Sequence, residues 1–149
     1  MFITKNSGRN KQGGQTVIET VLMLFFLLVL FFLIAEFARA WYLKNSLNNA
    51  ARVGVRVAVV TPNLSGSGPI SCSSASGPVF DAICSSPGLP DTTQVTLSIE
   101  DDVGPAAPPA SSGDTIRVAI AADFETFVPG IIPGLNDISV FAETSMRYE

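Results

Sequence analysis

The stretch GGQTVIETVLMLFFLLVLFFLIAEFARAW, residues Gly13–Trp41, decides the fold of this chain. Its apolar run, residues 17–35, contains only two polar side chains, those of Glu19 and Thr20. As an α-helix, a run of this length rises about 28 Å, which is close to the thickness of the hydrocarbon core of a bilayer. The sequence therefore predicts a transmembrane helix that carries a carboxylate just inside its front edge.

The charges on the two sides of this run differ. Lys5, Arg9 and Lys11 precede it, and no acid occurs among the first fourteen residues, so the N-terminus is expected in the cytoplasm and the rest outside. Residues 1–57 hold seven Lys or Arg and two Glu, whereas residues 58–149 hold two Arg and eleven acids. An outer part this acidic repels phosphates, so we do not expect a nucleic-acid partner.

Three kinds of N-terminal segment fit this pattern. A plain signal anchor is kept whole. A secretory signal peptide would be cut after Ala40, although the apolar run is longer than usual and Glu36 and Arg39 crowd that site. A prepilin leader, residues 1–14, is cut on the cytoplasmic side, so that the apolar helix stays on the mature protein. The three alternatives leave mature N-termini at Met1, Trp41 and Gln15.

The front of the chain carries a group of motifs that point to one of these alternatives. Gly14-Gln15 is followed by Glu19, by the apolar run, by EFARAW at residues 36–41 and by NAARVGVRVA at residues 49–58. This region resembles the TadE-like minor pilins or pseudopilins of tight-adherence (Flp-type, type IV pilus-related) systems. The tail FVPGIIPGLNDISVFAETSMRYE, residues 127–149, also resembles the ending of that family, whereas the middle diverges. Thr20 departs from the pattern, because many members carry an aromatic residue there.

The resemblance implies a fold, a location and a set of partners. The fold is α+β and pilin-like, and the protein is not an enzyme. A prepilin peptidase cuts between Gly14 and Gln15, and the mature helix sits in the bacterial inner membrane. An inner-membrane assembly platform then extracts it from the bilayer, and the helix contacts other pilins or pseudopilins in a filament.

Glu19 needs a physical account of its own. An unpaired charge in the bilayer centre costs about 2.5–3.5 kcal/mol on insertion scales. Cleavage after Gly14 creates an amine on Gln15, one helical turn from Glu19, and the resemblance implies that such a contact between subunits sets the axial register during assembly. The alternative is a carboxylate near the interface that snorkels or is protonated, since a helix N-terminus also favours an acid.

The helix is expected to continue well beyond the apolar run. No strong breaker occurs before Thr61-Pro62, so residues 15–60 are predicted to form one helix of roughly 69 Å. Apolar and small side chains recur along it at steps of three or four, interrupted by Lys44. This face is expected to pack on the protein's own head or on a neighbouring subunit; its members are Phe37, Trp41, Leu47, Ala50, Ala51, Gly54 and Ala58.

The C-terminal part, residues 94–149, is predicted to be a β-rich head. Three segments alternate apolar and polar side chains, as a half-buried strand does. They are TQVTLSIE at residues 93–100, TIRVAIAAD at 115–123 and DISVFAETSMRY at 137–148. Three strands of this kind, paired antiparallel, can lay one apolar face on the second half of the helix.

The segment between helix and head, residues 61–93, is rich in Ser, Gly and Pro and is predicted to be a loop. Its anchor is the pair Cys72 and Cys84, which can oxidise outside the cytoplasm. A disulfide there closes a loop of about 13 residues and contributes about 3 kcal/mol. The segment VFDAIC, residues 79–84, can form a helical turn that brings the cysteines together. Reduced cysteines stay open as an alternative, and the C-x11-C spacing is not that of a redox pair.

The composition argues against several kinds of chemistry. The chain contains no histidine, which rules out Ser-His-Asp and Cys-His catalysis and removes the commonest zinc ligand. Glu100-Asp101-Asp102 lacks the spacing of a calcium loop. No catalytic, metal-binding or cofactor-binding residue is therefore expected. Besides the pilin, an uncut membrane-anchored binding protein and a secreted enzyme released at Ala40 remain as alternatives.

Overall fold

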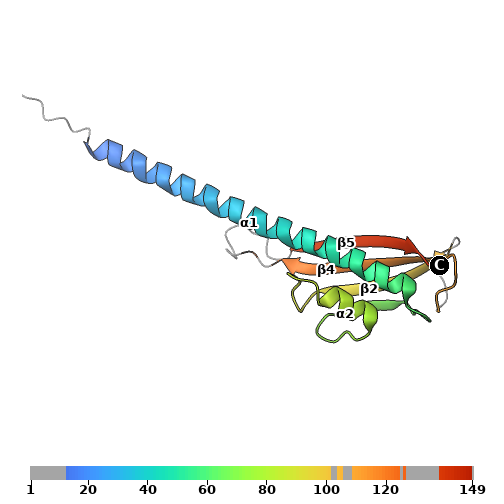
Figure 1. The fold of residues 1–149 in the computed structure, drawn as a ribbon. Coiled ribbons are helices and arrows are strands. Elements are labelled where there is room, and N and C mark those ends of the chain that lie inside the picture. The colour runs from blue at the N-terminus through green and yellow to red at the C-terminus, as the bar shows by residue number, and fades with distance from the viewer. Residues whose placement is uncertain (1–12, 102–103, 106–108, 125, 127–137, 149) are drawn as a thin grey trace, which may run out of the picture. The chain divides into compact units, whose positions relative to one another are not determined.

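The computed structural model of the 149-residue chain describes residues 13–101, 104–105, 109–124, 126 and 138–148. The chain divides into two compact units, Met1–Phe37 and Ala38–Glu149. We call the second the head unit. Helix α1, Gly13–Val60, runs through both units (Figure 1).

The first unit consists, in its described part, of the apolar portion of α1. By length and composition α1 is able to cross a membrane, and no part of its most apolar window is buried. Large side chains such as Phe25 and Phe26 are 68% and 66% exposed. Apolar surface this extensive and continuous marks a membrane or protein contact.

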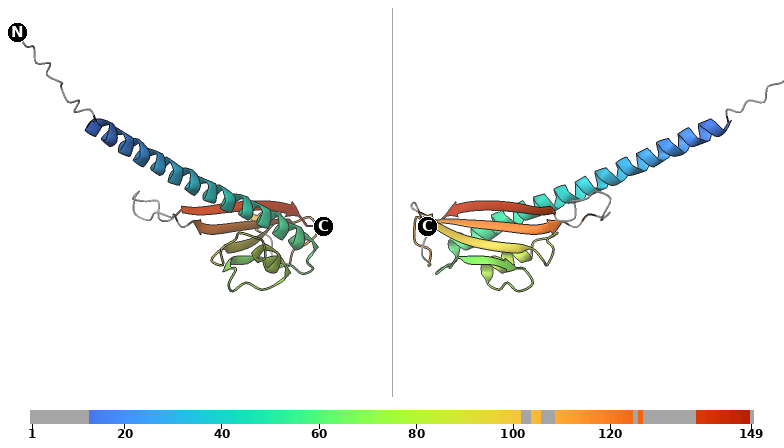
Figure 2. Two further views of the ribbon diagram at one scale, coloured as in Figure 1. Left: turned by 60° about the vertical axis from the view of Figure 1, so that its left-hand side comes forward. Right: turned by 180° about the vertical axis from the view of Figure 1, so that it is seen from behind.

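The head unit combines the remainder of α1 with a short helix and a five-stranded sheet. Helix α2 spans Pro78–Cys84, and the sheet has the order β1-β2-β4-β5, with β3 also paired to β2. Every pairing is antiparallel. Figure 2 shows α1 lying across one face of the sheet. The strands are β1 Ser67–Ser71, β2 Gln94–Asp101, β3 Gly104–Pro105, β4 Thr115–Phe124 and β5 Ile138–Arg147.

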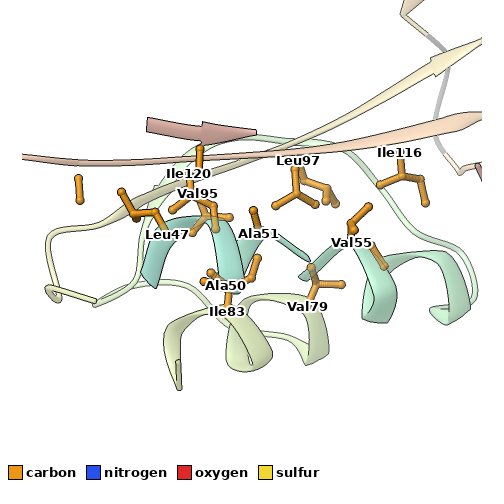
Figure 3. Packing of buried hydrophobic residues seen from close by; sticks show 14 of the residues in the cluster. Leu47, Ala50, Ala51, Val55, Val79, Ile83, Val95, Leu97, Ile116 and Ile120 are labelled. Carbon is orange, nitrogen blue, oxygen red and sulfur yellow. The ribbon is translucent and has the colours of Figure 1, made fainter. Parts of the chain in front are cut away.

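The core lies between α1 and the sheet, because β2 and β4 alternate buried and solvent-facing side chains. Figure 3 shows Leu47, Ala51 and Val55 of α1 pointing toward the strands, and Ala50 facing Ile83 of α2. Burying an aliphatic side chain of this size contributes about 1.5–3 kcal/mol. The strand residues that complete this core are Val95, Leu97, Ile116, Val118, Ile120, Ala122, Phe124 and Ala142.

This architecture confirms the α+β, pilin-like prediction: a long N-terminal apolar helix packs on a small antiparallel sheet. The three predicted strands are β2, β4 and β5. Alternation did not predict β1 or β3. The strand β1 has the sequence SGPIS and a register shift between Ser67 and Ile70, so its extended form depends on pairing with β2 rather than on its own apolar pattern.

Some sequence predictions lie outside the described residues. Residues 1–12 of the leader belong to this group, as does the segment FVPGIIPGL, residues 127–135. Asp102 of the acidic cluster does as well.

Candidate functional site

The N-terminal site begins at the first turn of α1. Gly14, Gln15 and Glu19 are all helical and exposed. Gln15 and Glu19 are four residues apart, so their side chains lie on the same face of the helix. A Cβ built on Gly14 meets nothing within 4 Å, so the backbone here is open to another molecule. The hydroxyl of Thr20 donates to the carbonyl oxygen of Thr16 at 2.8 Å, which places this polar side chain against the helix itself.

The second half of α1 supplies a packing face of small and aliphatic residues. Leu43, which the sequence analysis did not include, is 8% exposed and begins this face. Trp41 is 61% exposed. It precedes Leu43 by two positions, which corresponds to a rotation of about 200° around the helix, so its side chain points away from the face that Leu43 begins. Phe37, in the first unit, is 68% exposed. Of the residues expected on this face, the head unit buries Leu47, Ala50, Ala51, Gly54 and Ala58.

Gly54 permits the closest approach on this face. A Cβ placed there would lie 2.5 Å from both Cδ1 and Cγ1 of Ile83, which is fully buried in α2. The position therefore requires glycine as long as α2 keeps its place against α1. This is the reason that the small-residue pattern exists at this point of the helix.

A disulfide holds α2 at this place. Cys72, after the end of β1, is bonded to Cys84, the last residue of α2, and their Cα atoms are 5.6 Å apart. The pairing predicted from the sequence is therefore present, and so is the helical turn expected at its second cysteine. The amide of Cys72 also donates to the carbonyl oxygen of Thr93 at 2.9 Å, which ties the same corner to the start of β2.

The chain that follows α2 lies against α1. Gly88 has φ +83°, a conformation that favours glycine, and a Cβ there would lie 2.8 Å from the ring of Tyr42. One turn further along α1, the Ser46 hydroxyl donates to the carbonyl oxygen of Pro87. Residues 85–90 are thereby fixed beside the first turns that α1 contributes to the head unit.

Lys44 interrupts the apolar face because it reaches the edge of the sheet. Its ammonium group donates to the carbonyl oxygen of Phe141 and lies 4.9 Å from the centre of that ring. Tyr148 donates its amide to Asp114, so alternation along β5 directs the backbone groups of Phe141 to the open edge. Lys44 therefore covers one acceptor of that edge.

The solvent-facing side of the sheet carries an ion-pair group. Arg117 on β4 pairs with Glu100 on β2 at 2.9 Å and with Glu143 on β5. The hydrogen bond that Arg117 donates to Glu100, together with the charges of both carboxylates, raises the pKa of Arg117 above its usual value. These groups link three strands.

Among the residues that the structure describes, no three His, Cys, Asp or Glu side chains gather as metal ligands would. What the described geometry does offer is an exposed apolar helix with an early carboxylate and a small-residue packing face. Residues 14–56 match the TadE-like protein family. The TadE-like segment begins at Gly14, includes Glu19 and the apolar run, and ends at Arg56 within the packing face.

The match confirms the TadE-like resemblance predicted from the N-terminal motifs. A TadE-like segment on a long apolar helix is consistent with a pilin-like protein of a Tad system, from a family that is generally not enzymatic. The match does not reach the C-terminal tail, whose resemblance stays a prediction. No curated protein and no solved structure matches the chain.

The predicted site residues fall into two groups. Gly14, Gln15 and Glu19 lie in the first unit, whereas the small-residue face and the disulfide come together in the head unit. Sequence reasoning missed the contacts of Lys44 and of Arg39, whose guanidinium lies 5.4 Å from the ring centre of Phe124. A basic residue breaking an apolar helix face was the available signal for Lys44.

Proposed function

We propose that this chain is a minor pilin or pseudopilin of a tight-adherence system. A prepilin peptidase cuts it after Gly14, on the cytoplasmic side of the inner membrane. The mature chain then spans the membrane once, with Gln15 inside and the head unit outside. Through its apolar helix it joins other pilins or pseudopilins, and so serves as a component of a filament or of its assembly.

One observation carries this proposal: the TadE-like match starts at Gly14, the residue after which the prepilin pattern expects the cut. The family likeness, residues 14–56, thus begins at the proposed cut and leaves the basic residues before it out. The structure supports access to this bond, since Gly14 is exposed and lies in the first turn of α1, where the backbone N–H groups have no partner within the helix. A peptidase can therefore open this turn at low cost.

The role proposed for Glu19 is to pair with the amine that cleavage creates on Gln15. The two positions share one face of α1, one turn apart, so the pair can form within a subunit or between neighbours. In hydrocarbon the pairing offsets the cost of the isolated carboxylate. A neighbouring helix that supplies the amine would thereby be held at one axial position.

Filament incorporation tests this proposal. Cells that carry the wild-type chain, Glu19→Gln or Thr20→Val are sheared to release their filaments. Mass spectrometry then quantifies the chain in the released filaments and in the membrane. Glu19→Gln keeps the shape of the side chain and removes its charge. We expect it to remain in the membrane at wild-type level and to fall at least tenfold in the filaments, as the loss of a charged hydrogen bond implies.

Thr20→Val is the matched control, because it changes the adjacent residue and keeps the carboxylate. Equal incorporation of Glu19→Gln and wild type would remove the proposed role of Glu19. If the wild-type chain is itself absent from filaments, and filaments form normally without it, the result would favour an uncut membrane-anchored binding protein instead.

A further inference from the structure

The side of α1 that points away from its buried residues carries two exposed arginines, Arg52 and Arg56. They are four positions apart, so their guanidinium groups lie next to each other on the helix surface. Each is also two positions from the buried Gly54, a rotation of about 200°, so both point away from the side of α1 on which α2 packs. We call Arg52 and Arg56 the basic pair.

The basic pair has no anion within the head unit. From residue 37 to residue 60, α1 contains two further basic residues, Arg39 and Lys44, and no acid. Like charges at a spacing of four residues destabilise a helix. Within the part of the chain that the structure describes, neither Arg52 nor Arg56 forms an ion pair. Two like charges held together in this way favour an anionic partner from outside the chain.

The position of the basic pair along α1 argues against a lipid headgroup as that partner. Arg52 follows Ala35, the last residue of the apolar run, by 17 positions, which is about 26 Å along a helix. The headgroup layer outside the hydrocarbon core is about 5–7 Å thick. At physiological salt, charges farther apart than about 8 Å are largely screened. If residues 17–35 span the membrane, the anion therefore belongs to a protein.

The short helix α2 carries an acid that points outward. Val79 and Ile83 are 3% and 0% exposed and hold α2 against the core. Asp81 is two positions from each of them, so its side chain points to the opposite side of α2, where it is exposed. Among the described residues its carboxylate has no partner. It is thus directed toward a neighbouring molecule and away from its own α1.

The contact between α1 and α2 places this acid at the level of the basic pair. Ile83 lies against Gly54, which is midway between the two arginines and about 3 Å from each along the helix axis. Asp81 precedes Ile83 by two positions, about 3 Å along α2. Two copies with parallel α1 helices at the same depth in one bilayer therefore present the acid of one and the bases of the other at one height.

Other described acids of the head unit fit less well. Four of them already have partners: Glu100 and Glu143 pair with Arg117, and Asp101 and Asp114 accept backbone amides. Two more are exposed but lie at a lower level of α1. Asp91 follows Gly88, which lies beside Tyr42, and Asp123 precedes Phe124, whose ring lies beside Arg39. Tyr42 and Arg39 are about 15 and 20 Å before Arg52 along the helix.

We propose that a second copy of this chain docks beside the first in the membrane, through the basic pair of one copy and α2 of the other. Arg52 and Arg56 donate to the carboxylate of Asp81. The two surfaces lie on different sides of one head, so the contact is heterologous and can continue from copy to copy as a row or a ring. The inference rests on the membrane-anchored part of the proposed function and needs neither cleavage nor filament entry.

A charge swap tests this contact. Copies of the full chain, labelled with a donor or an acceptor fluorophore on an added C-terminal tag, are reconstituted in vesicles of phosphatidylcholine, and energy transfer gives their association constant. We expect Asp81→Arg to associate at least threefold more weakly than the wild type, the effect of one exposed ion pair. The double variant Arg52→Asp/Arg56→Asp is expected to lose as much.

The decisive sample is the mixture of these two variants. Each contact between unlike copies joins an acid to a base again, so the mixture is expected to associate as the wild type does. Restored association also shows that both variants are folded. The matched control is Asp91→Arg, which changes the net charge by the same amount as Asp81→Arg and is expected to associate as the wild type does.

Three results would overturn the proposal: a wild type that does not associate in the vesicles, a mixture that associates no better than its two variants, or an equal loss in Asp91→Arg. None of them concerns the proposed cleavage. Conversely, a mature N-terminus at Met1 would contradict the pilin proposal and leave the charge swap unaffected.

A zero-length cross-link tests the geometry separately. Arg52→Lys keeps the charge and supplies an amine that a carbodiimide joins to a touching carboxylate. Copies with natural and with heavy nitrogen are mixed in the vesicles, cross-linked and digested. We expect mass spectrometry to find a peptide that joins position 52 of one isotope to Asp81 of the other. Absence of this mixed-isotope peptide would contradict the pairing.

Discussion

Gly54 of α1 lies so close to Ile83 of α2 that a Cβ at Gly54 would come within 2.5 Å of the Ile83 side chain. The two residues are 29 positions apart in sequence. Their contact fixes α2 against α1, and Figure 3 shows Ile83 of α2 beside this helix. It also explains why a glycine, which weakens a helix, occurs at this point of a long one.

Gly54→Ala is therefore expected to destabilise the head unit. Because a Cβ at Gly54 would meet two atoms of the buried Ile83 at 2.5 Å, we expect an overpacking cost of about 2–3 kcal/mol, in the upper part of the usual range. The helix gains about 1 kcal/mol, so the net loss is about 1–2 kcal/mol. Urea unfolding of the full chain in detergent, followed by circular dichroism, measures this. Gly68→Ala is the control, because a Cβ at Gly68 meets nothing within 4 Å. Adding Ile83→Val to Gly54→Ala removes the Cδ1 atom of Ile83 and should restore part of the lost stability. If Gly54→Ala is as stable as the wild type, the close contact with Ile83 is contradicted.

The disulfide between Cys72 and Cys84 is expected to stabilise the same corner. Its sequence separation is 12 residues, for which the chain-entropy model gives about 3 kcal/mol. The double variant Cys72→Ala/Cys84→Ala should lose stability by this amount in the same unfolding measurement. A reducing agent should lower the stability of the wild type and leave the double variant unchanged. Equal stability of the two proteins under oxidising conditions would show that the bridge contributes little.

The pairs of Arg117 with Glu100 and Glu143 are exposed, so water and salt screen them and each is expected to contribute little to stability. The hydrogen bond to Glu100 and the charges of Glu100 and Glu143 raise the pKa of Arg117 above its usual range. The stability gained from its positive charge is therefore complete at neutral and moderately basic pH and is lost only as the pH rises through the higher folded pKa. Arg117→Gln should therefore destabilise the protein equally at pH 7 and pH 10. A difference between the two pH values would show that another group titrates with this pair.

Lys44 is expected to protect the open edge of β5. Lys44→Met removes the donor to Phe141 and the contact with its ring, which together are expected to contribute about 1 kcal/mol. A charged side chain on an edge strand also opposes pairing with another chain. We expect Lys44→Met to self-associate more than the wild type in analytical ultracentrifugation, and Lys44→Arg to behave as the wild type does. Equal association of Lys44→Met and wild type would show that Lys44 does not protect this edge.

The sequence was sufficient to predict the elements whose pattern is local. The apolar run, the alternation in β2, β4 and β5, and the pairing of Cys72 with Cys84 are each readable from a few neighbouring residues. The pattern alone did not decide which side of the helix packs on the head, because Trp41 and Leu43 are both apolar and their side chains point about 200° apart around the helix. Only the head decides which of them is buried.

Contacts between distant segments were not predictable in the same way. The predicted strand TIRVAIAAD ended at Asp123, so it did not include Phe124, and nothing local places this ring under Arg39. Similarly, β1 lacks an apolar pattern and is extended because β2 offers it a partner. The open groove of the head unit, which Tyr42, Pro90 and Phe124 help to line, is formed by three segments that meet only in the folded chain.

The mature N-terminus of the protein, isolated from its native membrane, tests the central claim most directly. Intact mass and N-terminal peptide mapping are compared for the wild type and for Gly14→Val, a position where an added side chain meets no neighbour. The account predicts that the wild type begins at Gln15 and that Gly14→Val keeps its first fourteen residues. A wild-type chain that begins at Met1, or one released at Trp41, would contradict it.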